Sequence, residues 1–383
     1  MLAQIDISGF KAIKDTGAID LGPFTLLIGR NGSGKSSLLE SLQWLQDALA
    51  VGLDEATARF GAFDSLLNRR STGIELKLTH ITGAREVRYQ VRVEESPGKS
   101  IAPAVRREAC REGRTSGARW TIRSRVMRNR ASVRSIAGGN PIRDRNTLAL
   151  SAVIKTKAPG AERLLEFLQH AVFLRLSPAA MAGFGRLSSV SSGSLLDEEG
   201  RNLVALLNSL SSARRRWVSE QVAMVIDGVE GIDVVRFNDS IGSYRTRERM
   251  RSQGGTKVYT VPSRLLSEGT RRITALFALL AAEPRPSLIA IEEIENGLDP
   301  WTLRFVLNSL REASTEGVQI LLTTHSPFLL DHVDPTEVLH VRRIKGDTVY
   351  EPITSFDDVV KNQNVIAPGA MYLAGYMNDT EEN

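Results

Sequence analysis

The sequence has few of the features that mark secreted or membrane proteins. Its 383 residues include one cysteine, Cys110, which excludes an internal disulfide and favours a reducing compartment. The longest apolar segment, Ile273–Ala282, is too short to cross a bilayer. The first residues lack the basic start and apolar stretch of a signal peptide. We therefore expect a cytoplasmic protein without a membrane partner, and 42% hydrophobic residues suffice for a sizeable core.

A glycine-rich segment near the start is the most informative feature that is present. Residues 29–36 read Gly-Arg-Asn-Gly-Ser-Gly-Lys-Ser and fit the pattern G-x-x-x-x-G-K-[ST]. The apolar run Phe24–Ile28 predicts a buried strand before it. After it, leucines at helical spacing predict a helix. Strand, glycine loop and helix start together predict a loop whose N–H groups bind phosphate.

This context assigns the phosphates of a nucleotide to the loop. Lys35 is expected to reach the β- and γ-phosphates, and the Ser36 hydroxyl is expected to bind Mg²⁺. The residues assigned to the nucleotide here are Gly29, Asn31, Gly32, Ser33, Gly34, Lys35, Ser36 and Ser37.

Two adjacent acids follow a second apolar run. Ser287–Ile291 predicts a strand buried on both faces, and it delivers Glu292 and Glu293 to its carboxyl end. We assign Glu292 to the metal, and Glu293 to orienting or deprotonating an attacking water. Two acids at an ordinary strand end are the alternative interpretation.

A capped helix start precedes the acidic strand. Residues 266–272 read Leu-Ser-Glu-Gly-Thr-Arg-Arg and open an apolar helix. Ser267 suits the N-cap, and Gly269 permits the close approach of a ligand. The local chemistry by itself indicates no more than a capped helix.

A third apolar run ends in a histidine. Val318–Thr324 predicts a buried strand, and His325 follows it at the position where an imidazole can contact a γ-phosphate. A satisfied core histidine is the alternative. Between the acids and this strand, Asn296–Pro300 predicts a turn and a helix start.

In their order, these segments resemble the motifs of ABC-type ATPase heads, and best those of the branch formed by SMC proteins, RecF and the OLD-like ATPases, often called AAA-type predicted ATPases. The matching segments are the phosphate loop, L-S-x-G at 266–269, the acids, G-L-D-P at 297–300 and T-T-H-S at 323–326. Residues 5–11, 196–203 and 291–298 also look like segments of that branch. The resemblance implies an α/β fold: a P-loop NTPase of ABC-ATPase type, with a mixed central sheet flanked by helices, a β-rich basic lobe and a helical insertion.

The resemblance also implies a mechanism in which two heads enclose two ATP molecules. Each nucleotide would touch the phosphate loop of one chain and Ser267 and Gly269 of the other. Asp299 would couple the two sites, and His325 would contact the γ-phosphate. Many such heads have a glutamine loop that binds Mg²⁺, and Gln90 is a candidate for it. The residues expected to act in catalysis are Lys35, Glu293 and His325.

We expect one ATPase head with three parts. Residues 1–160 form a first lobe with the phosphate loop and an arginine-rich β region, 161–262 a mainly helical insertion, and 263–383 a second lobe. No sustained heptad repeat separates the phosphate loop from the acids. That absence argues against a long SMC-type coiled coil and favours a compact head.

Positive charge is concentrated in two places. Between Arg106 and Arg145 there are twelve arginines against three acids, a net charge of +9, although the whole chain is only +5. A second basic region runs from Arg236 to Lys257. Such density is typical of phosphate-backbone binding, so we expect region 106–145 to contact DNA. A solvated basic surface and a surface for an acidic protein are the alternatives.

The process that the ATPase drives has three candidate answers. The first is DNA repair or anti-phage defence with a separate effector, such as a nuclease. OLD proteins carry a TOPRIM nuclease after the head, whereas fewer than 60 residues follow His325 here. The second is a regulatory scaffold that holds a toxic effector and releases it. The third is the ATP-binding subunit of a transporter, against which the arginine-rich insert argues.

Overall fold

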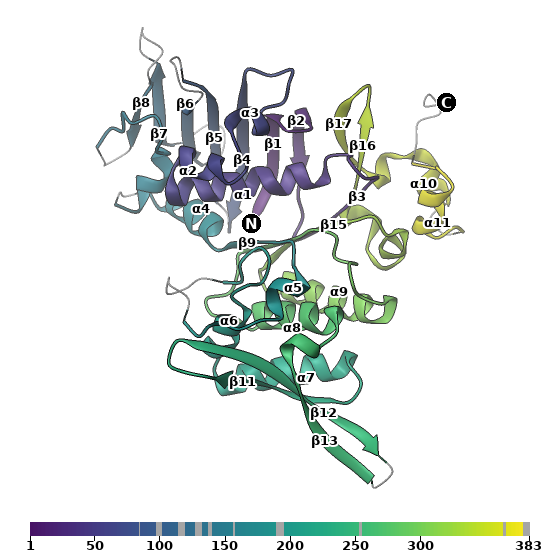
Figure 1. Ribbon diagram of the computed structural model, residues 1–383. Helices are drawn as coiled ribbons and strands as arrows, with labels where there is room; N and C mark the ends of the chain where they lie inside the picture. Colours follow the sequence, from purple (N-terminus) through teal and green to yellow (C-terminus); the bar gives the residue numbers. More distant parts are fainter. Residues whose placement is uncertain are drawn as a thin grey trace. The chain divides into compact units, whose positions relative to one another are not determined.

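The chain folds into two units (Figure 1). The computed structural model describes residues 1–83, 85–96, 102–113, 119–126, 132–136, 140–155, 158–188, 195–252, 255–362 and 365–377. The first unit contains Met1–Gln169 and Thr323–Asn383, and the second contains His170–Leu322. This division differs from the expected three parts. Residues after 323 belong with the phosphate loop, because a strand from that region pairs beside the strand that precedes the loop.

An antiparallel seven-stranded sheet forms much of the first unit, in the order β2-β1-β4-β5-β6-β7-β8. The expectation of a β-rich structure for the arginine-rich region is confirmed, since that region supplies the last three strands. The strands are β1 (Leu2–Phe10), β2 (Ile13–Asp20), β4 (Gly73–Thr82), β5 (Arg85–Glu95), β6 (Pro103–Glu112), β7 (Arg119–Val126) and β8 (Ser132–Ile136).

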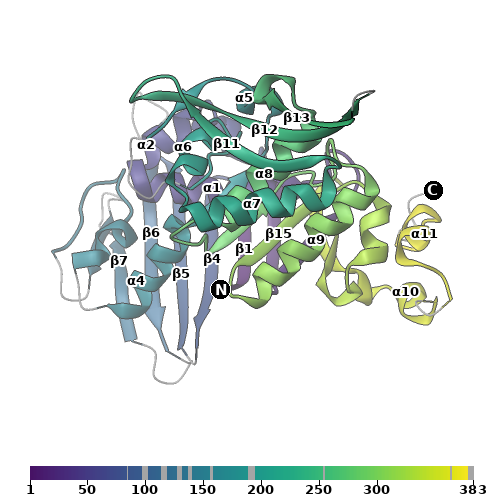
Figure 2. The ribbon, with the colours of Figure 1, turned by 90° about the horizontal axis from the view of Figure 1, so that it is seen from below.

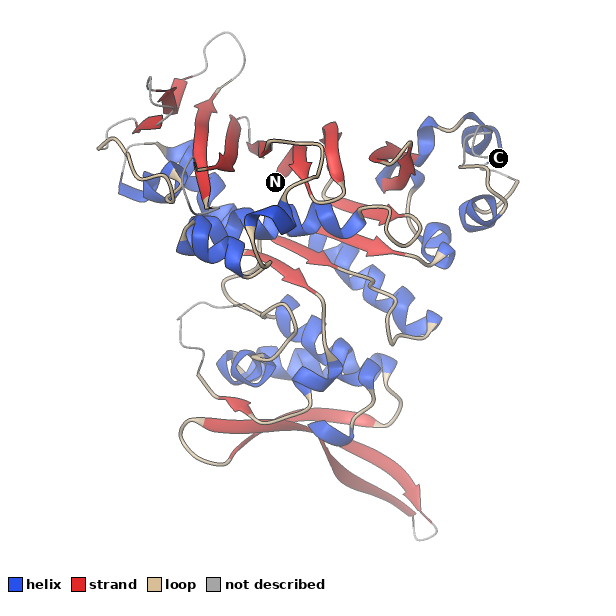
Figure 3. Cartoon of the chain, turned by 45° about the horizontal axis from the view of Figure 1, so that its top comes forward, coloured by secondary structure: helices blue, strands red, loops and turns tan. Residues whose placement is uncertain are grey.

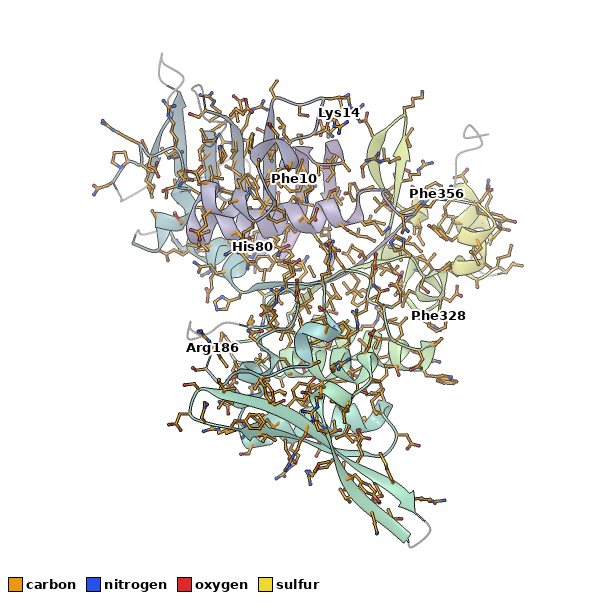
Figure 4. All side chains as sticks on the ribbon, in the orientation of Figure 1. Phe10, Lys14, His80, Arg186, Phe328 and Phe356 are labelled. Atoms are coloured by element: carbon orange, nitrogen blue, oxygen red, sulfur yellow. The ribbon has the colours of Figure 1, made fainter. Side chains whose placement is uncertain are left out.

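One face of this sheet is buried and the other is exposed. In β4, Ile74, Leu76 and Leu78 are buried, while the alternate residues are partly exposed, as period-two patterning requires. Helices α1 (Lys35–Val51) and α4 (Pro159–Gln169) contact the strands on the buried side (Figure 3). The ring of His80, labelled in Figure 4, lies 4.9 Å from that of Phe167 of α4. The outer face therefore presents its polar residues to solvent.

The first unit contains a second group of strands, and the phosphate loop follows one of them. β3 (Phe24–Ile28) is buried, as predicted, and pairs in parallel with β16 (Val338–Ile344). β16 pairs antiparallel with β17 (Asp347–Pro352). The predicted helix is α1, and the leucines that indicated it are buried. The other helices are α2 (Leu53–Ala58), α3 (Phe63–Leu66), α10 (Asp357–Asn362) and α11 (Pro368–Leu373).

Parallel strands form the core of the second unit. β14 (Leu288–Ile291) lies between β9 (Ala171–Leu174) and β15 (Gln319–Thr324), and all their residues are buried. Continuous apolar runs suit strands covered on both faces, so the strands predicted at 287–291 and 318–324 are confirmed. The helices are α5 (Pro178–Met181), α6 (Leu203–Ser209), α7 (Ser212–Val225), α8 (Glu268–Leu280) and α9 (Pro300–Thr315). In the described part of the chain, no helix has both the length and the apolarity needed to span a bilayer.

The expected helical insertion also contains a β-sheet. β12 (Ile241–Ser252) pairs with β10 (Gly185–Arg186), β11 (Val229–Arg236) and β13 (Gly255–Pro262), all antiparallel. Helix α7 packs against β11 (Figure 2). Helical spacing ends with α7, and the alternating arginines that follow have the period of a strand. The prediction of a mainly helical segment was therefore wrong beyond residue 226.

Candidate nucleotide-binding site

The phosphate loop has a backbone that only glycine adopts without strain. Gly32 and Gly34 have φ angles of 73° and 112°, and Gly34 is the N-cap of α1. The N–H groups at the start of this helix form a site for an anion. The Ser33 hydroxyl is buried, with no hydrogen-bond partner among the residues that the structure describes. These features fit a bound phosphate chain.

Strands from the far end of the sequence support the loop. A Cβ on Gly29 would lie 2.0 Å from the carbonyl oxygen of Val341 in β16. The Tyr350 hydroxyl of β17 donates to the carbonyl oxygen of Gly34 at 2.7 Å. These supporting residues were not identified from the sequence, because no local pattern links them to a loop some 300 positions earlier. Only the pairing of β16 with β3 brings them there.

Lys35 and His325 lie together at the loop. The Lys35 ammonium donates to the carbonyl oxygens of Gly29 at 2.7 Å and Arg30 at 3.0 Å, and it lies 3.2 Å from His325 Nδ1. An ammonium group only donates, so Nδ1 accepts and the imidazole proton is on Nε2. His325 therefore offers an N–H donor directed away from Lys35. Two residues predicted to act on the same phosphate meet in one unit.

A cavity of about 560 Å³ opens beside the loop. This volume lies within the range of about 300–1,000 Å³ typical of small-molecule sites. Its walls come from residues 29–33, His325, residues 340–343 of β16, and Tyr372 of α11. The C-terminal helix therefore contributes an aromatic ring to the space next to the phosphate loop.

The signature segment lies in the second unit and packs against the turn that follows the acids. Ser267 is the N-cap of α8, and its hydroxyl accepts from the Thr270 N–H at 3.0 Å, as predicted. A Cβ on Gly269 would lie 2.8 Å from the carbonyl oxygen of Gly297. Gly269 is therefore required by contact with this turn, and Ser267 remains exposed at the helix N-terminus.

Glu292 forms an ion pair with an arginine that the sequence analysis did not identify. The Nε of Arg175 donates to the Glu292 carboxylate at 2.8 Å. Arg175 follows β9 as Glu292 follows β14, and parallel neighbours end at the same edge. That shared position after a buried strand is the signal that could have found it. Among the described residues, no group of three or more His, Cys, Asp or Glu side chains could hold a metal.

Glu293 has a strained backbone at the end of β14. Its φ angle is 49°, which costs a non-glycine residue about 1–3 kcal/mol and is typical of functional sites. The Asn296 amide donates to its carboxylate at 2.6 Å. Burial lowers the pKa of the nearby Arg272 guanidinium, while Glu268 and Glu293 raise it. The acid is thus held in one position near a positive charge.

Asp299 and Gln90 have local structural partners. The Asp299 carboxylate caps α9 and accepts from the Thr302 hydroxyl at 2.6 Å, which lowers its pKa together with the backbone N–H groups of the cap. Gln90 lies in the middle of β5, between two paired strands, and donates to Glu75 at 2.9 Å. The assignment of Gln90 to a glutamine loop was therefore wrong, because it is not in a loop.

Comparison with known proteins identifies the family. A family model described as "AAA domain, putative AbiEii toxin, Type IV TA system" matches residues 24–331. The chain belongs to this AAA-domain family. The resemblance to ABC-type ATPase heads of the SMC and OLD-like branch is thereby confirmed.

Curated relatives of this AAA-domain protein match over short stretches. The Old nuclease of Escherichia phage P2 is 48% identical over 50 residues, which are 13% of this chain and 8% of the nuclease. The energy-coupling factor transporter ATP-binding protein EcfA of Methanocaldococcus jannaschii is 23% identical over 135 residues, which are 35% of this chain and 48% of EcfA. The chain thus spans less than half the length of each.

Two solved structures share the fold of this AAA-domain protein. An Smc head bound to the C-terminal winged-helix domain of ScpA has a TM-score of 0.52 at 16% identity, covering 91% of this chain and 96% of that one. An Smc head with an extended coiled coil, bound to the C-terminal domain of ScpA from Pyrococcus furiosus, has a TM-score of 0.50 at 14% identity, covering 95% and 99%. The expected fold, an ABC-type P-loop ATPase with mixed α/β structure, is confirmed.

Proposed function

We propose that this AAA-domain protein binds ATP and hydrolyses it to ADP and phosphate as a cytoplasmic dimer. The observation that carries the proposal is the left-handed glycine loop with Lys35 and His325 3.2 Å apart beside it. Helix N-terminus, ammonium and imidazole N–H together present donors to a triphosphate. The family membership supports the same chemistry.

The roles follow from the donors and acceptors available. Loop N–H groups and Lys35 hold the phosphates, and Ser37 lies in the first turn of α1 behind them. Ser36 and Glu292 would hold Mg²⁺, which neutralises phosphate charge when bound. Glu293 orients or deprotonates the attacking water, because its carboxylate is fixed by Asn296 at a strained turn.

The proposed dimer encloses ATP between the phosphate loop of one chain and the signature segment of the other. Three features of the second unit support it. Ser267 is exposed at the start of the 13-residue helix α8, where an anion is favoured. Gly269 packs directly on the turn of Gly297, and Asp299 fixes the helix after that turn. A nucleotide at the α8 N-terminus would therefore be linked to the acids of the same chain.

We propose that hydrolysis serves DNA repair or anti-phage defence together with a separate effector, with DNA contacted through the arginine-rich region. The partial match to the Old nuclease supports this assignment. A second candidate is a regulatory scaffold that sequesters and releases a toxic effector without nucleic acid. The family description includes the words "putative AbiEii toxin, Type IV TA system", and this link to toxin–antitoxin systems supports that candidate.

Mixing two inactive variants tests the shared site. Lys35→Ala removes the phosphate contact and Ser267→Arg blocks the signature, so a mixed dimer keeps one intact site. We expect the mixture to recover a clear fraction of wild-type phosphate release, while each variant alone stays inactive. Ser211→Arg changes the N-cap of α7 in the same way and is the control, expected to remain active alone. No recovery in the mixture would refute the shared site.

A further inference from the structure

The outer face of the seven-stranded sheet carries arginines that ATP hydrolysis does not use. The outward-facing set in the middle of β5 to β7 is strongly basic, and all its members except Ala109 are at least partly exposed. We call this set the arginine face. It consists of Arg88, Gln90 and Arg92 on β5, Arg107, Ala109 and Arg111 on β6, and Arg123 on β7.

The strand register places like charges opposite each other. Arg88 is paired with Arg111 across β5 and β6, and Arg92 is paired with Arg107. Like charges directly opposite one another destabilise a sheet. Glu86 contacts Arg88, Glu94 lies 2.8 Å from Arg92, and Glu75 of β4 lies opposite Arg92 in the strand register. The two like-charged pairs concentrate positive charge on one face of the sheet, which favours an anionic partner.

The arginine face is hollow between its two like-charged pairs. Gln90 and Ala109 lie opposite each other there, and both side chains are shorter than arginine. A concavity of about 440 Å³ lies over them and extends to Lys77 of β4, which pairs with Asp6 at 2.8 Å. Guanidinium groups therefore surround a depression rather than a protrusion.

We propose that the arginine face binds the phosphate backbone of duplex nucleic acid, an inference that rests on and deepens the proposed contact with DNA. A guanidinium group donates two parallel hydrogen bonds to phosphate oxygens. The seven positions contain no aromatic ring, on which the bases of a single strand would stack. They also contain no large apolar side chain of the kind that forms the centre of protein interfaces.

This surface differs from the region defined by arginine density along the chain. Arg134 of that region is fully buried and lies 3.7 Å from Glu108, so it is part of the core. Arg114, Arg128 and Arg130 lie outside the described residues. Conversely, Arg88 and Arg92 precede the dense region in the sequence, and the pairing of β5 with β6 brings them next to its arginines.

The test is a titration of the full-length chain, without nucleotide, into fluorescent duplex DNA about two helical turns long at several salt concentrations. We expect R88E/R111E to bind roughly tenfold or more weakly and to reduce the log–log salt slope by about 2, one for each lost phosphate contact. R186E/R216E makes the same charge change at exposed positions of the second unit and should bind like wild type.

Further measurements separate binding from folding and from catalysis. Melting temperatures show which variants are folded, and the DNA affinity of R88E/R111E should fall in protein that is folded. ATP turnover without nucleic acid should be unchanged in R88E/R111E, so the ATPase proposal stands or falls separately. A titration with duplex RNA of equal length shows whether the face binds the DNA backbone or the RNA backbone. Weaker binding of either duplex by R88E/R111E supports the proposal.

Two results would overturn the inference. One is R88E/R111E with wild-type affinity and salt slope, or with a loss no greater than that of R186E/R216E. The other is tighter binding of the corresponding single strand than of the duplex.

Discussion

In the first unit the candidate phosphate site is built from backbone, whereas in the second unit the acids are held by side chains. Gly29 abuts the Val341 carbonyl, and Gly34 accepts a hydrogen bond from Tyr350, so the loop's conformation is set before a ligand arrives. Glu292 and Glu293 instead depend on Arg175 and Asn296. A backbone cradle is rigid, while ion pairs and amide contacts can exchange. The comparison predicts that substitutions in the loop impair ATP binding, whereas substitutions at the acids impair ATP hydrolysis.

Lys35→Ala should have the largest effect, because it removes the charged donor from an otherwise rigid cradle. We expect ATP affinity to fall roughly 100-fold or more, since charge-assisted contacts to phosphate are the strongest available. Isothermal titration calorimetry measures it, with Lys361→Ala, on the exposed surface of α10, as control. Unchanged ATP affinity would show that the loop does not bind the phosphates.

Glu293→Gln should separate turnover from binding. The amide keeps the size of the side chain but cannot take a proton, so phosphate release should fall roughly 100-fold. Affinity should stay near wild type, because no loop contact changes. Glu316→Gln, on the surface after α9, is the control. Full hydrolysis by Glu293→Gln would move the role to another residue.

Arg175→Ala should have a smaller effect, and it should make the protein need less Mg²⁺ for turnover. Removing the guanidinium takes one competing partner from the Glu292 carboxylate, so the Mg²⁺ concentration for half-maximal turnover should fall by about threefold. Arg201→Ala breaks another exposed ion pair of the second unit, with Glu199, and should leave it unchanged. A higher Mg²⁺ requirement in Arg175→Ala would mean that Arg175 positions the acid for the metal.

The smallest effect concerns pH and the first unit. Burial lowers the pKa of His80 and of His340 to about 4, so the folded chain keeps both neutral where the unfolded chain protonates them. The unfolded state then binds more protons, and the free energy of unfolding should decrease as pH falls from about 6.5 to about 4. Melting temperatures across this range measure it. His340→Phe should show a shallower decrease, and an identical profile would contradict the prediction.

Local patterns predicted several elements, among them those that form the candidate phosphate site. The phosphate loop between β3 and α1, the Ser267 cap and the buried strand before Glu292 were all confirmed, because each depends on neighbours within a few positions. Gln90 was misplaced because a glutamine carries no local signal of a loop. Arg175 was missed because its role depends on β9 lying beside β14.

The sequence alone indicated the candidate phosphate site, because glycine spacing, a helix start and one lysine lie within eight consecutive residues. Tertiary structure alone decided what supports that loop and which arginines share a surface. Hydrogen-bond register between distant strands places Tyr350 against Gly34 and Arg88 opposite Arg111. A shift of one residue in register would move each side chain to the other face, so no count of residue types along the chain predicts these contacts.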